Sequence, residues 1–293
     1  MTGRQAFKAS LLLLLAGLAV SVSAQTAPDT SKPAEEFPTT ITVHRKDKTI
    51  TAIRYGPNDA GLAVICAPPD SDPNAPTRSL LYDAPPYLVH VTISDNTILA
   101  PIATVLKQSN GDGHLEAYKG TVKDAPDNPD ACVLPTATPD LQPASVQVLQ
   151  GKTNLTGSKL TYDESDGLAV VDGPIVFNRP QAPVNGVPDT LNGTSDRITI
   201  NVDQSQTTLD GNVTLASRCR TSKAKRVLYD DKKNRAVLFG DPASSVEKNG
   251  NRVQGSELTY NLDTNDISVN GAVTGSLNDT DGCAAATPTP LSP

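Results

Sequence analysis

Residues 155–177 read Leu-Thr-Gly-Ser-Lys-Leu-Thr-Tyr-Asp-Glu-Ser-Asp-Gly-Leu-Ala-Val-Val-Asp-Gly-Pro-Ile-Val-Phe. Leu160 and Tyr162 alternate with polar neighbours, which is the pattern of a strand that is buried on one face. Residues 163–167 (Asp-Glu-Ser-Asp-Gly) are of types that favour a turn. The alternation resumes after them and is interrupted at residues 172–174 (Asp-Gly-Pro). The stretch therefore predicts a strand, a tight polar turn and a second strand.

The same strand–turn–strand unit recurs along the chain. Aligned on Tyr162, Ile200, Tyr229 and Tyr260, the units repeat with a period of about thirty residues, within the range typical of stacked units. Such a unit cannot bury its apolar face alone, so neighbouring units are expected to stack into long sheets. The pattern predicts an all-β, elongated β-jellyroll of two facing antiparallel sheets, as one body or as two in tandem.

Composition argues against several kinds of protein. The 293 residues carry a formal net charge of -7, whereas a general nucleic-acid binder needs clustered cations for the phosphates. The chain has no tryptophan and a single methionine, which disfavours large aromatic cages and Met-lined grooves. The 24 prolines and 20 glycines disfavour long helices beyond the N-terminus.

The N-terminus has the three-part pattern of an export signal. Arg4 and Lys8 precede an apolar run over residues 11–20, and small residues then end at Ala24, where cleavage is expected. A membrane anchor is the alternative, but the run is too short to span a bilayer comfortably. The mature protein is predicted to be periplasmic.

Shifts in composition predict the organisation of the chain. We expect a signal peptide (1–24), a flexible leader (25–38), N-terminal β repeats (39–123), a Pro-rich linker or insertion (124–143), a C-terminal β-jellyroll (144–278) and a disordered tail (279–293).

Four cysteines follow the signal: Cys66, Cys132, Cys219 and Cys283. Export makes disulfides the default interpretation, and four cysteines allow three pairings. The gap from Cys66 to Cys132 resembles that from Cys219 to Cys283, which favours one bridge in each half of the chain. No C-x-x-C pair is present, so zinc and redox roles are disfavoured.

The repeat motif resembles a known family. Residues 157–163 (Gly-Ser-Lys-Leu-Thr-Tyr-Asp) with 167–173, and residues 253–262 (Val-Gln-Gly-Ser-Glu-Leu-Thr-Tyr-Asn-Leu), are similar to the OstA/LptA organic-solvent-tolerance domain. The resemblance covers residues 145–277 and, more weakly, 40–122. It implies an elongated jellyroll that is open along one seam.

The family's periplasmic member holds the acyl chains of lipopolysaccharide between its two sheets, on a bridge between the membranes. The resemblance therefore implies lipopolysaccharide as the ligand, with end-to-end self-assembly and envelope-assembly proteins as partners. This chain is longer than the usual domain and has four cysteines and Pro-rich insertions, so another envelope lipid is an open alternative.

Inward-facing apolar side chains of the repeats are the candidate lining of a lipid-binding slot. Burying an acyl chain contributes about 0.8 kcal/mol per CH₂. The alternative is that these side chains pack against each other in a closed core. The candidates are Leu160, Tyr162, Ile198, Ile200, Val202, Tyr229, Leu258, Tyr260 and Leu262.

One basic cluster is a candidate contact for lipid headgroups or a membrane surface, because cations bind phosphates. Its members are Arg218, Arg220, Lys223, Lys225 and Arg226. The alternative is a charged strand that blocks pairing at a sheet edge.

Catalysis finds little support in the sequence. His44, His90 and His114 have no acid or nucleophile in a catalytic motif beside them. We therefore expect no enzyme activity, metal or cofactor. A structural envelope protein with a closed β core that assembles through strand edges is the main alternative function, and a wall- or glycan-binding sandwich is a third.

Overall fold

The structure is a computed structural model. It describes residues 39–45, 48–66, 75–123, 133–184, 186–202, 204–230, 232–261, 267–271 and 273–276. These residues belong to one compact unit, Glu36–Pro293. None of the helices found in these ranges is long and apolar enough to cross a membrane. The expected signal peptide, leader and tail lie outside the described residues.

Short strands make up the N-terminal half (residues 39–123) and the start of the C-terminal half (residues 144–276). They are β1 (Thr39–Arg45), β2 (Lys48–Arg54), β3 (Gly61–Cys66), β4 (Thr77–Asp83), β5 (Val89–Ile93), β6 (Asn96–Ala100), β7 (Ile102–Lys107), β8 (Gly113–Tyr118), β9 (Gly120–Lys123), β10 (Thr136–Pro139), β11 (Val146–Gln150), β12 (Thr153–Gly157) and β13 (Lys159–Asp163). A single turn of 3-10 helix, η1 (Asn58–Ala60), precedes β3.

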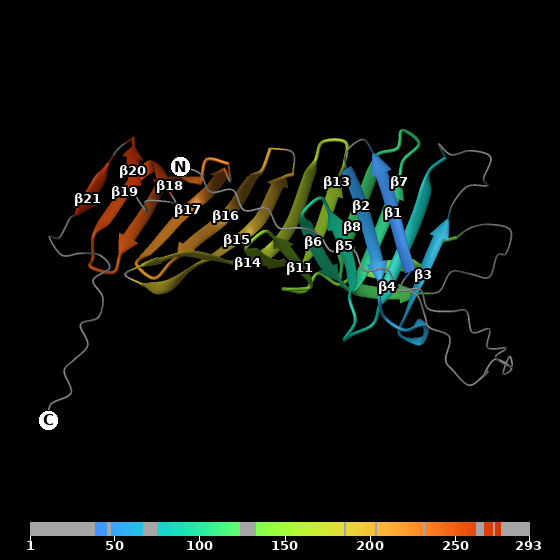
Figure 1. Cartoon of the computed structure of the whole chain (residues 1–293). Helices are drawn as coiled ribbons and strands as arrows, with labels where there is room; N and C mark the ends of the chain where they lie inside the picture. Colours follow the sequence, from blue (N-terminus) through green and yellow to red (C-terminus); the bar gives the residue numbers. More distant parts are fainter. Residues whose placement is uncertain are drawn as a thin grey trace, which may run out of the picture. The chain divides into compact units, whose positions relative to one another are not determined.

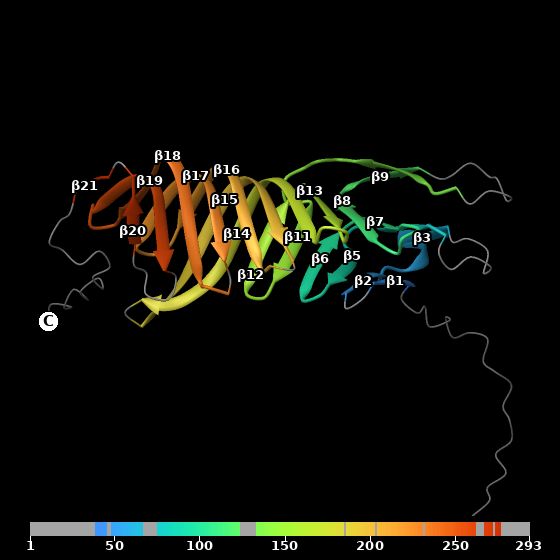
Figure 2. The same ribbon diagram turned by 90° about the horizontal axis from the view of Figure 1, so that it is seen from above.

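Longer strands follow. They are β14 (Leu168–Val184), β15 (Val187–Asn201), β16 (Gln206–Ala216), β17 (Arg220–Asp230), β18 (Arg235–Glu247) and β19 (Arg252–Asn261), and then the short β20 (Ile267–Asn270) and β21 (Thr274–Ser276). Figure 1 shows these strands side by side in chain order, and Figure 2 gives the same strands from above.

The antiparallel pairings define two facing layers. Layer A runs β1–β2–β5–β6–β11–β12 and continues into one end of each long strand, up to β21. Layer B runs β3–β4–β7–β8–β13 and continues into the other end of each long strand, up to β20. Each long strand therefore contributes to both layers.

The long strands pass from one layer to the other at β-bulges. Register shifts fall between Asp172 and Ile175 in β14 and at the matching places in β15 to β18. Bulges bend a strand, and Gly211 takes a positive φ at one of them. The bends line up on one side of the unit, which we call the corner. The hairpin turns of both layers lie on the opposite side, which we call the mouth.

A buried ion pair closes the corner in the N-terminal half. Nε of Arg54 lies 2.7 Å from Oδ1 of Asp83, and the two side chains are 4% and 0% exposed. The other oxygen of Asp83 accepts the backbone N–H groups of Tyr55 and Gly56. These bonds fix the chain where it leaves β2 for layer B.

The predicted fold class is confirmed: an all-β unit of two facing antiparallel layers, built from strand–turn–strand repeats. The two halves are continuous, because β6 pairs with β11 in layer A and β8 pairs with β13 in layer B. Apart from β9 and β10, the described strands therefore form one jellyroll and not two in tandem. Residues 133–143, from the expected Pro-rich linker, include β10, which pairs with β9 in a separate two-stranded sheet.

Candidate functional site

An apolar ladder runs along the inner face of layer B in the C-terminal half. Neighbouring strands place its residues in register, and we call them the inner ladder: Leu160, Val171, Ile198, Leu209, Val227, Leu238, Leu258 and Val269. Each is at most 5% exposed except Val269, which is partly buried. The inner ladder is a continuous apolar surface across β13 to β20.

A second ladder lies one step closer to the mouth. We call it the tyrosine ladder: Tyr162, Ala169, Ile200, Thr207, Tyr229, Ala236, Tyr260 and Ile267. The four residues on which the sequence repeats align are all in it, so the repeat period is the strand-to-strand register of layer B.

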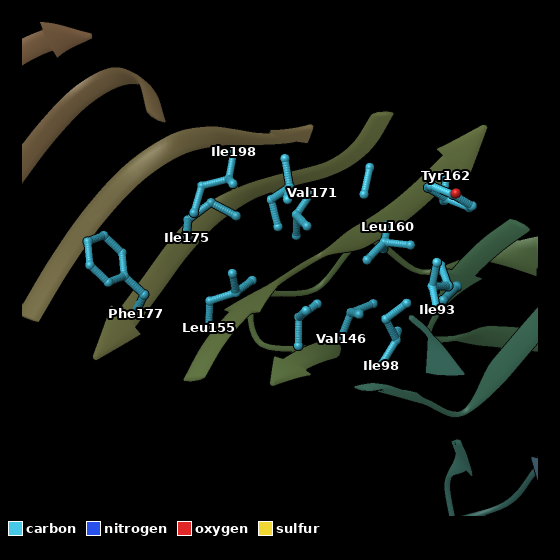
Figure 3. Close-up of a cluster of buried hydrophobic side chains, with 14 of the residues drawn as sticks. Ile93, Ile98, Val146, Leu155, Leu160, Tyr162, Val171, Ile175, Phe177 and Ile198 are labelled. Atoms are coloured by element: carbon cyan, nitrogen blue, oxygen red, sulfur yellow. The ribbon is translucent and has the colours of Figure 1, made fainter. Parts of the chain in front are cut away.

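The structure brings the predicted lining residues together between the layers. Leu160, Tyr162, Ile198, Ile200, Leu258 and Tyr260 are at most 9% exposed, and Val202 and Tyr229 pack against the same core. Leu262 lies outside the described residues. Figure 3 shows side chains of both layers pointing toward one another. The two layers are therefore in contact. This arrangement corresponds to the closed core, which was the alternative to a lipid-binding slot in the sequence analysis.

Layer A faces the ladders with a different set of residues. In register these are Leu155, Phe177, Gly193, Leu215, Ser222, Ser245 and Val253. A side chain at Gly193 would overlap the Phe177 ring, so the ring lies over this glycine. This face was not predicted from the sequence, although Leu155 and Phe177 are the first and last residues of the stretch in which the repeat is clearest.

One polar crossing joins the layers through hydroxyl groups. The Tyr260 hydroxyl, from layer B, lies 2.6 Å from Oγ of Ser222 and 2.8 Å from Oγ of Ser245, both in layer A. Oγ of Ser222 also donates to Oγ of Ser245 at 3.1 Å. We call these three groups the hydroxyl ring.

The mouth side of the hydroxyl ring is charged. The Arg220 guanidinium lies 5.2 Å from the centroid of the Tyr260 ring and forms an ion pair with Glu247. Burial raises the pKa of the Glu247 carboxyl, but hydrogen bonds from Arg220 and Asn251 and the charge of Arg220 outweigh burial, so the pKa is lowered overall. The ion pair is therefore charged at neutral pH.

A second polar crossing lies nearer the N-terminal half. Arg179, in the layer A part of β14, donates a hydrogen bond to the Tyr229 hydroxyl in layer B. Its guanidinium also lies 4.9 Å from the centroid of the Tyr229 ring. Hydrogen-bonded tyrosines therefore connect the two layers at two places in the C-terminal half.

The predicted basic cluster does not form one patch. Arg220 points inward, whereas Lys223, Lys225 and Arg226 are exposed on the outer side. Lys225 and Arg226 have acidic neighbours there, Asp241 at 3.9 Å and Asp210 at 2.6 Å respectively. β17 pairs with β16 and β18, so these cations do not protect a sheet edge.

Two open cavities lie outside the inner ladder. One, of about 320 Å³, is lined by Lys233, Arg235, Thr259, Tyr260, Asn261, Ile267 and Ser268. The other, of about 540 Å³, is lined by Asp210, Lys225, Arg226, Phe239, Gly240, Asp241 and Ser256. The described residues contain no group of three or more His, Cys, Asp and Glu that could hold a metal ion.

Neither of the two described cysteines, Cys66 and Cys219, is a free thiol. They are too far apart to bond to each other. The pairing path β3–β4–β7–β8–β13–β14–β15–β16 separates them, and seven steps of about 4.8 Å give roughly 34 Å, against about 4.4–6.8 Å between the Cα atoms of a disulfide. Cys132 and Cys283 lie outside the described residues.

The match to a protein-family model supports the resemblance in the C-terminal half. Residues 144–266 match the family model described as LptA/(LptD N-terminal domain) LPS transport protein. Among solved structures, LptH, the LptA homologous periplasmic component of the lipopolysaccharide transport device from Pseudomonas aeruginosa, is 16% identical; the match covers 43% of this chain and 94% of that chain, with a TM-score of 0.37. No curated protein matches the chain. The predicted OstA/LptA-like character is confirmed for residues 144–266.

Proposed function

We propose that this OstA/LptA-like chain acts in the periplasm, where it binds the apolar part of lipopolysaccharide or a related envelope lipid between layers A and B. The observation that carries the proposal is the inner ladder, which continues in register across β13 to β20 without a polar residue. An acyl chain that replaces layer A against this surface gains about 0.8 kcal/mol per buried CH₂.

Entry of a lipid requires the layers to part at the mouth, with the corner as the hinge. In the C-terminal half this breaks the bonds of Tyr229 and Tyr260 to layer A. Each of these hydrogen bonds contributes only about 0.5–1.5 kcal/mol net while water reaches the separated groups at the open mouth. A few buried CH₂ groups offset this loss, provided that the bound lipid leaves no separated hydroxyl buried without a partner.

Headgroup contact is a separate part of the proposal. Of the five cations in the basic cluster, Arg218 follows the end of β16 at the mouth and Arg220 begins β17 there. The exposed Arg218 would meet a headgroup that stays outside the layers, whereas Arg220, which pairs with Glu247, would meet a polar group that enters the mouth. Lys223, Lys225 and Arg226 would face a membrane surface or a partner protein instead.

A second part of the proposal concerns the pairing of the four cysteines in disulfide bonds. With a Cys66–Cys219 bond excluded by distance, two pairings remain, and we favour Cys66 with Cys132 and Cys219 with Cys283. Peptide mapping of the non-reduced protein distinguishes this arrangement from the crossed one, because each pairing links different peptides.

A structural envelope protein with a closed core is the second candidate, and the burial of the predicted lining residues favours it. Native mass spectrometry of the protein purified from its own envelope separates the two functions. Lipid carriage predicts a co-purifying lipid in stoichiometric amount. Absence of lipid, together with no displacement of a bound acyl probe by envelope lipid extracts, would rule carriage out.

A further inference from the structure

The hydroxyl ring consists of three buried hydroxyl groups that hydrogen-bond to one another inside an apolar core. Ser222 and Ser245 are each 2% exposed and Tyr260 is 9% exposed. Each hydroxyl has one proton to donate, and the three contacts of the ring use three protons. The ring therefore satisfies its own donors without water.

Because of the hydroxyl ring, different parts of the core favour different groups of a bound lipid. A plain hydrocarbon that separates Tyr260 from Ser222 and Ser245 would leave their hydroxyls buried without partners, and that is unfavourable. A ligand group that donates and accepts hydrogen bonds can take the place of the Tyr260 hydroxyl. At the inner ladder, by contrast, hydrocarbon is the favoured occupant.

The polar groups continue from the ring to the mouth. Arg220 and Glu247 each lie two residues closer to the mouth than Ser222 and Ser245, on the same strands, and they pair with each other. A polar group that enters at β17 and β18 therefore meets hydrogen-bonding side chains along its whole path. On β12 and β14 the corresponding inner positions include the apolar Leu155 and Phe177.

We propose that the hydroxyl ring binds the hydrogen-bonding segment of an amphiphile, such as a hydroxyl or amide group, while the hydrocarbon lies on the inner ladder of β13 to β16. The inference rests on the proposed lipid-binding function and specifies the ligand class. The ring selects amphiphiles with a polar group within the buried segment over plain acyl chains.

The test compares two fatty acids of equal chain length, one saturated and one carrying a single hydroxyl group. Each displaces a fluorescent acyl probe from the full-length protein. The wild type should bind the hydroxylated chain about ten-fold more tightly, the factor that corresponds to about 1.4 kcal/mol. The triple variant Ser222→Ala/Ser245→Ala/Tyr260→Phe should lose this preference, because it removes all three hydroxyls and leaves none unpaired.

Ser195→Ala is the matched control. Ser195 is 4% exposed at the corner, and its hydroxyl donates to the Arg197 carbonyl, outside the ring. This variant should keep the wild-type preference. Equal affinity of both fatty acids for the wild type, or an unchanged preference in the triple variant, overturns the inference and leaves lipid binding intact. Binding of neither fatty acid to any variant overturns the proposed function and the inference with it.

Discussion

The two halves of the described unit fill their cores differently. In the N-terminal half both layers supply large buried side chains: Ile50, Val91 and Ile98 come from layer A, and Leu81, Val105 and Leu115 come from layer B. In the C-terminal half, layer B supplies the inner ladder, and from β15 onward layer A supplies mostly glycine, serine and alanine. Only the C-terminal half therefore sets a layer of large side chains against a layer of mostly small ones.

The halves also differ in how the mouth is closed. In the N-terminal half, Val43 and Ile50 of layer A are 5% and 1% exposed, and a side chain at Gly113 of layer B would meet both. In the C-terminal half, Arg179–Tyr229 and the hydroxyl ring join the layers. Parting the layers exposes apolar surface in both halves, but in the C-terminal half part of the contact between the layers is polar, and water can satisfy those groups when they separate. The C-terminal half is therefore the one that we expect to open.

The largest effect is expected at the N-terminal corner. Asp83→Ala leaves the buried Arg54 charge uncompensated, so the free energy of unfolding should fall by about 3–5 kcal/mol. Denaturant unfolding measures this change. Lipid content per folded molecule should stay at the wild-type value, and a selective loss of lipid would contradict the separation of the halves.

Two leucines on the inner face of layer B form a matched pair. Leu81 in the N-terminal half and Leu258 in the C-terminal half are each 0% exposed. Each Leu→Ala change should lower the free energy of unfolding by about 2–5 kcal/mol. Only Leu258→Ala should also weaken the binding of an acyl probe. Equal weakening by both variants would show that the halves do not differ in ligand binding.

Removal of one polar crossing should have a smaller and local effect. Tyr229→Phe deletes the hydroxyl that accepts from Arg179, at a cost of about 1 kcal/mol. Amide hydrogen exchange should become faster in β14 to β17 and stay unchanged in β5 to β7. Faster exchange throughout the unit would mean that the crossing supports the whole fold and not one mouth.

The smallest effect is a pH dependence at Glu247. The folded pKa is lowered, so the unfolded chain takes up the proton first as the pH falls. The stabilisation is present above the unfolded pKa and is lost as the pH falls through the folded pKa. We expect less than about 1 kcal/mol for this partly exposed pair. Glu247→Gln should remove this part of the acid dependence, measured as the difference between the two unfolding curves against pH.

Much of the fold was predictable from alternation alone. Tyr162, Tyr229 and Tyr260 fall on one ladder because a period-2 strand and a turn of fixed length return each repeat to the same register. The buried faces of the repeats and the turn that follows Asp163 were predictable for the same reason.

The corner and the polar crossings were not predictable. The break at Gly173 and Pro174 marks a bulge inside one strand, β14, that serves both layers, and local sequence does not reveal which layer a strand joins after a bend. The hydroxyl ring unites Ser222, Ser245 and Tyr260, which lie on three strands, and only the register of two facing layers brings them together.

The central claim is that the lipid chain lies between the layers of the C-terminal half. Photo-crosslinking tests it most directly, with a photoreactive residue placed at Ile200 in one variant and at Val91 in another, each 1–2% exposed. We expect a covalent lipid adduct, detected by mass spectrometry, from position 200 and none from position 91. Equal adducts from both positions, or an adduct from position 91 alone, would contradict the account.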